Sequence, residues 1–257
     1  MSTPTTRSGR SSTRERLPNL NFAEIQTECG PEVIEDSEYA PAFGTQPVEC
    51  YFRDVQKRLI ERIADYPVAV GCVAWLSDRG ILDALAKKRS AIVIQKEDFL
   101  RPDSGRFHRV DLRAMYAKVG GLDVGDLPHP LPDMSVCSNT SYKNFGVRCV
   151  GYAKRGSDIA VPRMHHKFLV FGRQPSGHHT SDADDAPWVR GDIEPQAVWT
   201  GSFNFTHNGG ESLENAVFIR SPKIAGCYLR EFAQVAALSE PLDWTSEYVE
   251  PEWRIGT

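Results

Sequence analysis

The 257-residue sequence lacks long apolar runs: no stretch approaches the ~20 apolar residues that cross a bilayer. The longest run, Val68 to Leu76, contains a glycine and suits a buried strand. An apolar signal segment is missing too, because residues 1–20 are dominated by polar types and hold no apolar core. We therefore expect no membrane-spanning segment, and a soluble protein that stays in the cytoplasm.

Cysteine is scarce, and its spacing is not that of a metal site. The six cysteines form no C-x-x-C pair and no zinc-like pattern. Without a secretion signal they are expected to be reduced and to pack rather than to bind metal. No cofactor is expected.

Charge is unevenly distributed behind a net value of −4. Residues 1–20 sum to +3 and suit a disordered basic tail, whereas residues 21–50 carry seven acids and no Lys or Arg. This acidic N-terminal extension either lies across a substrate groove or is a solvated linker. Residues 87–118 and 141–167 each sum to +5 within a neutral remainder. They are candidates for a basic surface facing a polyanion, although Lys87, Lys88 and Arg89 also suit a helix C-terminus.

Periodicity predicts one α/β domain over residues 51–257. A helix is expected from Tyr51 to Pro67, and strand 68–75, helix 78–88 and strand 91–95 then form a β-α-β unit with a parallel strand pair. Helices are also expected over 111–119 and from Ser221. Further strands are expected over 146–153, 167–171, 197–200 and 215–219.

Two short segments carry groups that suit phosphate chemistry. Because strand side chains alternate, His165 and Lys167 are expected on one face of a strand and His166 on the other. Ser202 and Asn204 are likewise expected on a common face. An imidazole, an ammonium, a hydroxyl and an amide together make a receptor for a phosphate group.

These segments resemble the H-x-K and G-S-x-N motifs of the phospholipase D superfamily, read here as His165-x-Lys167 and Gly201-Ser202-x-Asn204. Similar surroundings, Trp75 to Leu85 and Glu214-Asn215, extend the resemblance over most of residues 51–238. It implies a mixed β-sheet flanked by helices on both faces, and metal-independent phosphodiester hydrolysis through a phosphohistidine.

The resemblance also implies roles for the motif residues. His165 would attack phosphorus, while Lys167, Ser202 and Asn204 would hold the non-bridging oxygens. Glu214 would accept a hydrogen bond from His165. Because the chemistry needs two histidines and the chain has one motif, a homodimer with a composite active site is expected.

The sequence departs from the family pattern at two places. Gly172 stands where the family has aspartate, and the stretch 173–197 contains an insertion of 22 residues relative to the family spacing. A metal site there is one interpretation, because the insertion holds His178, His179, Asp182, Asp184 and Asp185. A solvated acidic loop is the interpretation we favour, since the surroundings are rich in Gly, Ser and Pro.

Three functions fit the sequence. An endonuclease acting on DNA or RNA is favoured by the basic segments beside the motif. The alternatives are a phospholipase or cardiolipin-type lipid hydrolase, and a non-catalytic nucleic-acid-binding protein. The candidate substrate-binding residues are the cations of the second basic segment: Lys143, Arg148, Lys154, Arg155 and Arg163.

Overall fold

The computed structural model describes most of the chain from residue 47 onward and a few short N-terminal segments. The described residues are 19–22, 25–27, 30–32, 47–97, 108–128, 135–137, 144–153, 162–174, 193–248, 250–251 and 254–256. Within these ranges, no helix is long and apolar enough to span a membrane.

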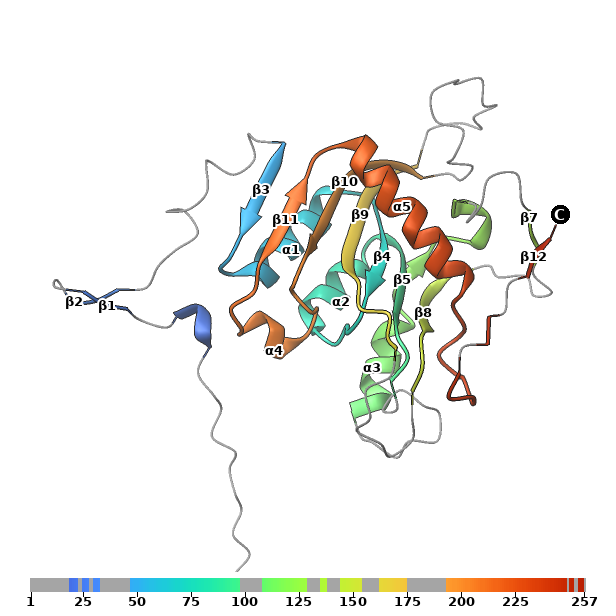
Figure 1. Cartoon of the computed structure of the whole chain (residues 1–257), viewed down its shortest axis with the longest axis horizontal. Coiled ribbons are helices and arrows are strands. Elements are labelled where there is room, and N and C mark those ends of the chain that lie inside the picture. The colour runs from blue at the N-terminus through green and yellow to red at the C-terminus, as the bar shows by residue number, and fades with distance from the viewer. Residues whose placement is uncertain are drawn as a thin grey trace, which may run out of the picture.

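A mixed sheet, eight-stranded within the described ranges, forms the centre of the molecule (Figure 1). Its strand order is β3-β11-β10-β9-β4-β5, and β6 and β8 both pair with β5 at its outer edge. The strands are β3 (Val48–Tyr51), β4 (Val68–Val73), β5 (Arg89–Gln95), β6 (Gly120–Gly121), β8 (Gly146–Val150), β9 (Lys167–Arg173), β10 (Glu194–Gly201) and β11 (Ala216–Ile219).

The expected β-α-β unit is confirmed, because β4 and β5 pair in parallel. The helix between them begins at an N-cap, where the Asp78 side chain accepts a hydrogen bond from the Ile81 amide at 2.9 Å. In chain order the helices are α1 (Val55–Asp65), α2 (Arg79–Leu85), α3 (His108–Tyr116), α4 (His207–Gly210) and α5 (Pro222–Ala237).

Helices cover both faces of the sheet, as the sequence predicts. Alternate strand residues divide between two apolar clusters: Leu169 and Phe171 pack with residues of α1 and α2, whereas Phe168 and Val170 pack with α5. Figure 1 shows α5 crossing one face, with α1 and α2 behind the sheet. The strand alternation that separates these clusters also decides which way the motif side chains point.

Short elements lie outside this sheet. A two-stranded pair joins β1 (Ile25–Thr27) to β2 (Gly30–Glu32), and another joins β7 (Ser135–Cys137) to β12 (Arg254–Gly256). Two 3₁₀ turns, Leu20–Phe22 and Val124–Asp126, complete the described elements.

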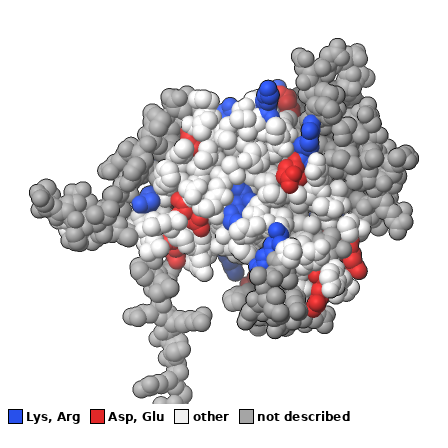
Figure 2. Space-filling view, in the orientation of Figure 1, with Lys and Arg blue, Asp and Glu red and all other residues white. Residues whose placement is uncertain are grey.

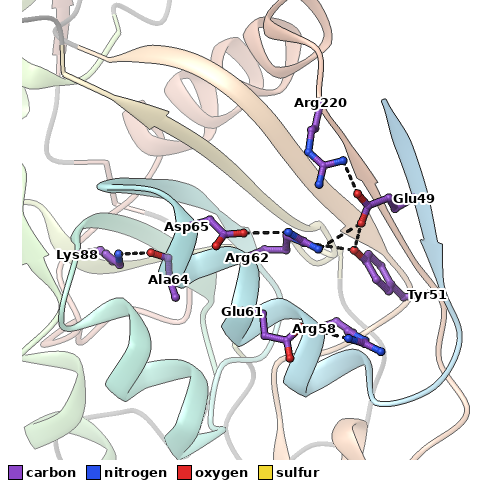
Figure 3. A network of polar contacts seen from close by, with 9 residues as sticks. All are labelled: Glu49, Tyr51, Arg58, Glu61, Arg62, Ala64, Asp65, Lys88 and Arg220. Atoms are coloured by element: carbon purple, nitrogen blue, oxygen red, sulfur yellow. Dashed lines mark hydrogen bonds and ion pairs between the residues drawn. The ribbon is translucent and has the colours of Figure 1, made fainter. Parts of the chain in front are cut away.

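The sheet begins before residue 51, inside the stretch expected to be an acidic extension. Strand β3 pairs with β11, so the expected helix start at Tyr51 is wrong and α1 begins at Val55. Glu49 of β3 is buried and lies between two guanidinium groups (Figure 3). It forms ion pairs with Arg62 of α1 at 3.3 Å and with Arg220, and it accepts a hydrogen bond from the Tyr51 hydroxyl.

This network joins the edge strand β3 to α1 through Arg62, and to the end of β11 through Arg220. Burial, together with the hydrogen bond to Glu49, raises the pKa of Tyr51 to about 12, so its hydroxyl stays protonated and continues to donate. One acid of the 21–50 stretch therefore stabilises the fold. Of the other six acids, only Glu32 lies within the described residues.

Glu49→Ala should destabilise the fold, because it removes the buried carboxylate that Arg62, Arg220 and the Tyr51 hydroxyl share. We expect a loss of about 3 kcal/mol in the free energy of unfolding, measured by urea denaturation. Glu61→Ala is the matched control, since its ion pair with Arg58 is much more exposed, and it should cost less than about 0.5 kcal/mol. Equal losses in the two variants would contradict this role for Glu49.

Candidate active site

The pairing of β9 with its two neighbours brings the motif segments to one end of the sheet. Lys167, the first residue of β9, lies opposite Val73 at the carboxyl end of β4. On the other side, Phe168 pairs with Thr200, so β10 ends beside the start of β9. Gly201, the last residue of β10, is level with Lys167, and Ser202 follows it directly. The register therefore brings together two motifs whose first residues, His165 and Gly201, are 36 positions apart.

His165 and Lys167 lie against one another, as the alternation predicts. The Lys167 ammonium is 3.2 Å from each ring nitrogen of His165 and donates to its backbone carbonyl, also at 3.2 Å. The Lys167 side chain is largely buried, whereas His165 is exposed. His166 points to the opposite face, where its Nε2 lies 3.1 Å from Glu231 of α5.

The surroundings favour a neutral imidazole at His165. Its pKa is lowered from 6.5 first by partial burial and then by the positive charges of Lys167, Arg163 and His166. Burial also lowers the pKa of Lys167, and the negative charge of Glu214 opposes that shift. At neutral pH the cluster therefore presents an unprotonated ring nitrogen next to an ammonium group, the combination needed to attack a phosphate diester.

Ser202 and Glu214 are hydrogen-bonded to each other, and their expected roles toward phosphate and His165 stay predictions. The Ser202 hydroxyl donates to Glu214 and accepts a hydrogen bond from the Asn215 amide at 3.1 Å. Because a hydroxyl has one proton, Ser202 does not offer it to a phosphate in this arrangement. The acceptor role of Glu214 is likewise directed to Ser202 and not to His165. Glu214 instead places a negative charge near Lys167.

Asn204 retains hydrogen-bonding capacity that a substrate would use. Its neighbours Phe203 and Phe205 are buried in the core and fix the extended segment. The main chain of Phe205 bridges to Leu76, which ties this segment to the end of β4. The Asn204 Oδ1 atom is buried without a hydrogen-bond partner among the described residues. An amide oxygen only accepts hydrogen bonds, so this atom would take one from a donor such as water or a substrate hydroxyl, whereas a non-bridging phosphate oxygen would need the Asn204 amide N–H₂ group.

The sequence did not identify Trp75 as part of the site. Its ring meets the His165 ring edge-on, with centroids 5.3 Å apart, and the Lys167 ammonium lies 5.7 Å from the ring centre. The indole N–H donates to Glu97 at 2.9 Å, and Glu97 also pairs with Arg163 at 3.4 Å. One feature of the sequence could have identified Trp75: it lies just after a buried strand, and residues at the carboxyl ends of neighbouring parallel strands lie at the same edge of the sheet.

Gly172 lies at the end of the β9–β10 pairing that is remote from the motif residues. Gly172 is five residues beyond Lys167, roughly 17 Å along the strand. A Cβ atom there would lie 2.5 Å from the Glu194 carbonyl oxygen. Arg173 and Glu194 close the described part of the hairpin with two contacts of 2.9 Å. The insertion begins beyond them, and its five His and Asp residues lie outside the described part of the chain.

The candidate substrate-binding cations separate into three groups. Arg148 is wrong as a substrate contact, because it is buried in β8 and donates twice to Ser239 at 2.9 Å. Arg163 lies at the site, beside Glu97. The other three, Lys143, Lys154 and Arg155, lie outside the described residues.

Four cations of the first basic segment lie away from the motif. Lys87, Lys88, Arg89 and Lys118 line an open cavity of about 580 Å³ at the amino ends of β5 and β6. The motif residues lie at the opposite, carboxyl end of β4 and β5. On the face that carries α5, Figure 2 shows basic and acidic side chains interspersed, without a single basic patch.

Replacing Lys167 should raise the pKa of His165, because a neighbouring positive charge is removed. In Lys167→Met, NMR titration of the His165 ring should give a pKa higher than in the wild type. His165→Ala assigns the resonance, and Lys88→Met, at the other end of the sheet, should leave the His165 pKa unchanged. A lower His165 pKa in Lys167→Met would contradict the proposed electrostatics.

Restoring the family's aspartate at Gly172 should not increase turnover, because this position is remote from His165. Gly172→Asp and Gly172→Ala should both lose about 1–3 kcal/mol in the free energy of unfolding, since a Cβ atom meets the neighbouring strand backbone. Gly125→Ala is the control, because a Cβ at Gly125 meets nothing within 4 Å. A several-fold gain in activity for Gly172→Asp would overturn this conclusion.

Comparisons with known proteins agree with this geometry. Residues 132–236 match the family described as "Cardiolipin synthase, PLD-like domain". An uncharacterized protein of Acanthamoeba polyphaga mimivirus is 27% identical over 223 residues, which cover 83% of this chain and 73% of that protein.

Two solved structures also align with the chain. Nuc from Salmonella typhimurium, a phospholipase D family member, has a TM-score of 0.43 and 15% identity, over 75% of this chain and 95% of Nuc. NucT from Helicobacter pylori has a TM-score of 0.42 and 13% identity, over 72% of this chain and 94% of NucT. Both motif segments fall inside the family range matched at residues 132–236, and they meet at one end of the sheet.

Proposed function

We propose that this protein is a phosphodiesterase that cleaves nucleic acid through a phosphohistidine at His165. The observation that carries the proposal is the contact of His165 with Lys167, in which an exposed imidazole with a lowered pKa lies 3.2 Å from a buried ammonium. The first group is a nucleophile at neutral pH. The second stabilises the negative charge that develops on the non-bridging oxygens.

The proposed reaction has two steps. A ring nitrogen of His165 forms a bond to phosphorus while the bond to the leaving oxygen breaks, and a protonated second histidine supplies a proton to that oxygen. Water then attacks the phosphohistidine, and the second imidazole takes its proton back as the nitrogen–phosphorus bond breaks. Asn204 and Lys167 hold the non-bridging oxygens in both steps, and Glu214, fixed by Ser202, keeps Lys167 charged.

The second histidine is proposed to be His165 of a second copy, related by a two-fold axis. Leu213 supports an interface at this end of the sheet, because it directly precedes Glu214 and its side chain is 56% exposed. A partner subunit on the axis would cover this apolar surface while it brings its own motif to the substrate.

Nucleic acid is the proposed substrate because Arg163 adds an exposed cation beside His165 and the buried Lys167. Lipid phosphodiesters are the second candidate, on the strength of the family description, "Cardiolipin synthase, PLD-like domain". Both substrates carry the same phosphodiester group, so the two candidates differ in the groups that flank it.

Cleavage assays distinguish the two substrates. Wild-type protein should cleave plasmid and oligonucleotide DNA or RNA in the presence of EDTA, because the proposed mechanism uses imidazole and ammonium groups instead of a divalent ion. His165→Ala and Lys167→Ala should each lower kcat by about 10³-fold or more while thermal unfolding stays close to that of the wild type. Hydrolysis of phosphatidylcholine or cardiolipin vesicles alone, or abolition by EDTA with rescue by Mg²⁺, would refute the nuclease mechanism.

A subunit-mixing experiment tests the shared site. Wild-type protein is mixed with His165→Ala and allowed to exchange subunits, and total activity is followed at constant protein concentration. If both histidines serve one site, a mixture with half wild-type subunits should retain about one quarter of the activity, because only wild-type pairs work. Retention of one half would mean that each chain has a complete site.

A further inference from the structure

Two exposed tyrosines form a pair at the same end of the sheet as His165. The rings of Tyr152 and Tyr248 lie 5.8 Å apart at an interplanar angle of 76°, and the residues are 39% and 69% exposed. Tyr152 follows β8, which runs parallel to β5, and β5 runs parallel to β4. Its position after β8 therefore places it at the carboxyl edge, where Trp75 and His165 lie. The mechanism proposed above does not use this pair.

A buried glutamine links Tyr152 directly to the motif. Gln95, at the end of β5, accepts a hydrogen bond from the Met164 amide at 2.8 Å and donates to the Tyr152 carbonyl at 3.0 Å. Met164 immediately precedes His165, so one side chain holds both segments. Gly151 makes room for this contact, because a Cβ atom there would lie 2.4 Å from Gln95 Oε1. The strand end thus fixes the spacing between the tyrosine and the nucleophile.

A buried lysine fixes Tyr248 in the same way. Lys96 is fully buried, and its ammonium donates to the carbonyls of Tyr248 at 2.6 Å and Ser246 at 3.0 Å. It also forms an ion pair with Glu240 and lies 4.6 Å from the Trp244 ring centre. Gln95, the last residue of β5, and Lys96, which follows it, therefore hold the backbones of both tyrosines, while both tyrosines remain exposed.

We propose that Tyr152 and Tyr248 form a stacking platform for an unpaired base of the substrate, which makes single-stranded nucleic acid the preferred substrate. The inference rests on the nuclease function proposed above. Exposed rings on a rigid backbone stack on a base with little loss of conformational freedom. Bases in a duplex are already stacked on their neighbours, so only a single strand offers a free base face. A lipid headgroup has no such planar group.

Kinetics on matched oligonucleotides test the platform. Tyr152→Ala and Tyr248→Ala should each raise KM for a single-stranded oligonucleotide by roughly 5- to 150-fold, the range expected for loss of one stacked base. Tyr→Phe variants at both positions should restore a wild-type KM, because the ring is kept. On an abasic strand of equal length and charge, the KM ratio of Ala variant to wild type should fall to about one, since no base remains to stack.

Ile224→Ala provides the matched control, because Ile224 is 40% exposed but lies in the first turn of α5, next to the far end of the sheet. It should leave KM unchanged. Normal KM values in the Tyr→Ala variants, on an oligonucleotide that wild-type protein cleaves, would overturn the platform and leave the nuclease proposal standing. Absence of cleavage by wild-type protein, with hydrolysis of cardiolipin vesicles, would overturn both.

Discussion

The antiparallel register of β9 between β4 and β10 is the constraint on which the rest of the site depends. It sets Lys167 opposite Val73 on one side, and it brings the end of β10 to the start of β9 on the other. Backbone hydrogen bonds in a sheet fix register strongly wherever both faces are buried, because a one-residue slip would exchange the two apolar clusters. The same register places Gly172 and Glu194 at the end of the β9–β10 pairing that is remote from His165.

Charged groups of opposite sign lie close together at the site: the Glu214 carboxylate is near the Lys167 ammonium, which lies against His165. Burial lowers the pKa of Lys167, and the negative charge of Glu214 opposes that shift; the pKa of His165 is lowered first by burial and then by the positive charge of Lys167. Ser202 holds Glu214 in position, because its hydroxyl donates a hydrogen bond to Glu214 and accepts one from the Asn215 amide. The G-S-x-N segment is thus connected to His165 through Glu214 and Lys167.

Local sequence patterns predicted the faces on which side chains lie and the pairing of neighbouring strands. They did not predict burial or the contacts between distant segments. Alternation correctly assigned His165 and Lys167 to one face and His166 to the other, and the parallel β4–β5 pair followed from an apolar strand-helix-strand pattern. Arg148 was misassigned because charge is visible in a sequence and burial against Ser239 is not. Glu49 was counted with an acidic extension because its two partners come from distant segments.

The end of β5 shows why such packing matters for function. Gln95 and Lys96 are fully or almost fully buried, yet each directs its hydrogen bonds to backbone carbonyls of segments that reach the surface. Leaving a buried ammonium or amide unpaired is costly, so these bonds hold the two surface segments in fixed positions. The nucleophile is held by the same strand end through Met164. A base on the tyrosines and a phosphate at His165 are therefore positioned by one rigid element, which is the condition for binding energy at the base to contribute to orienting the phosphate.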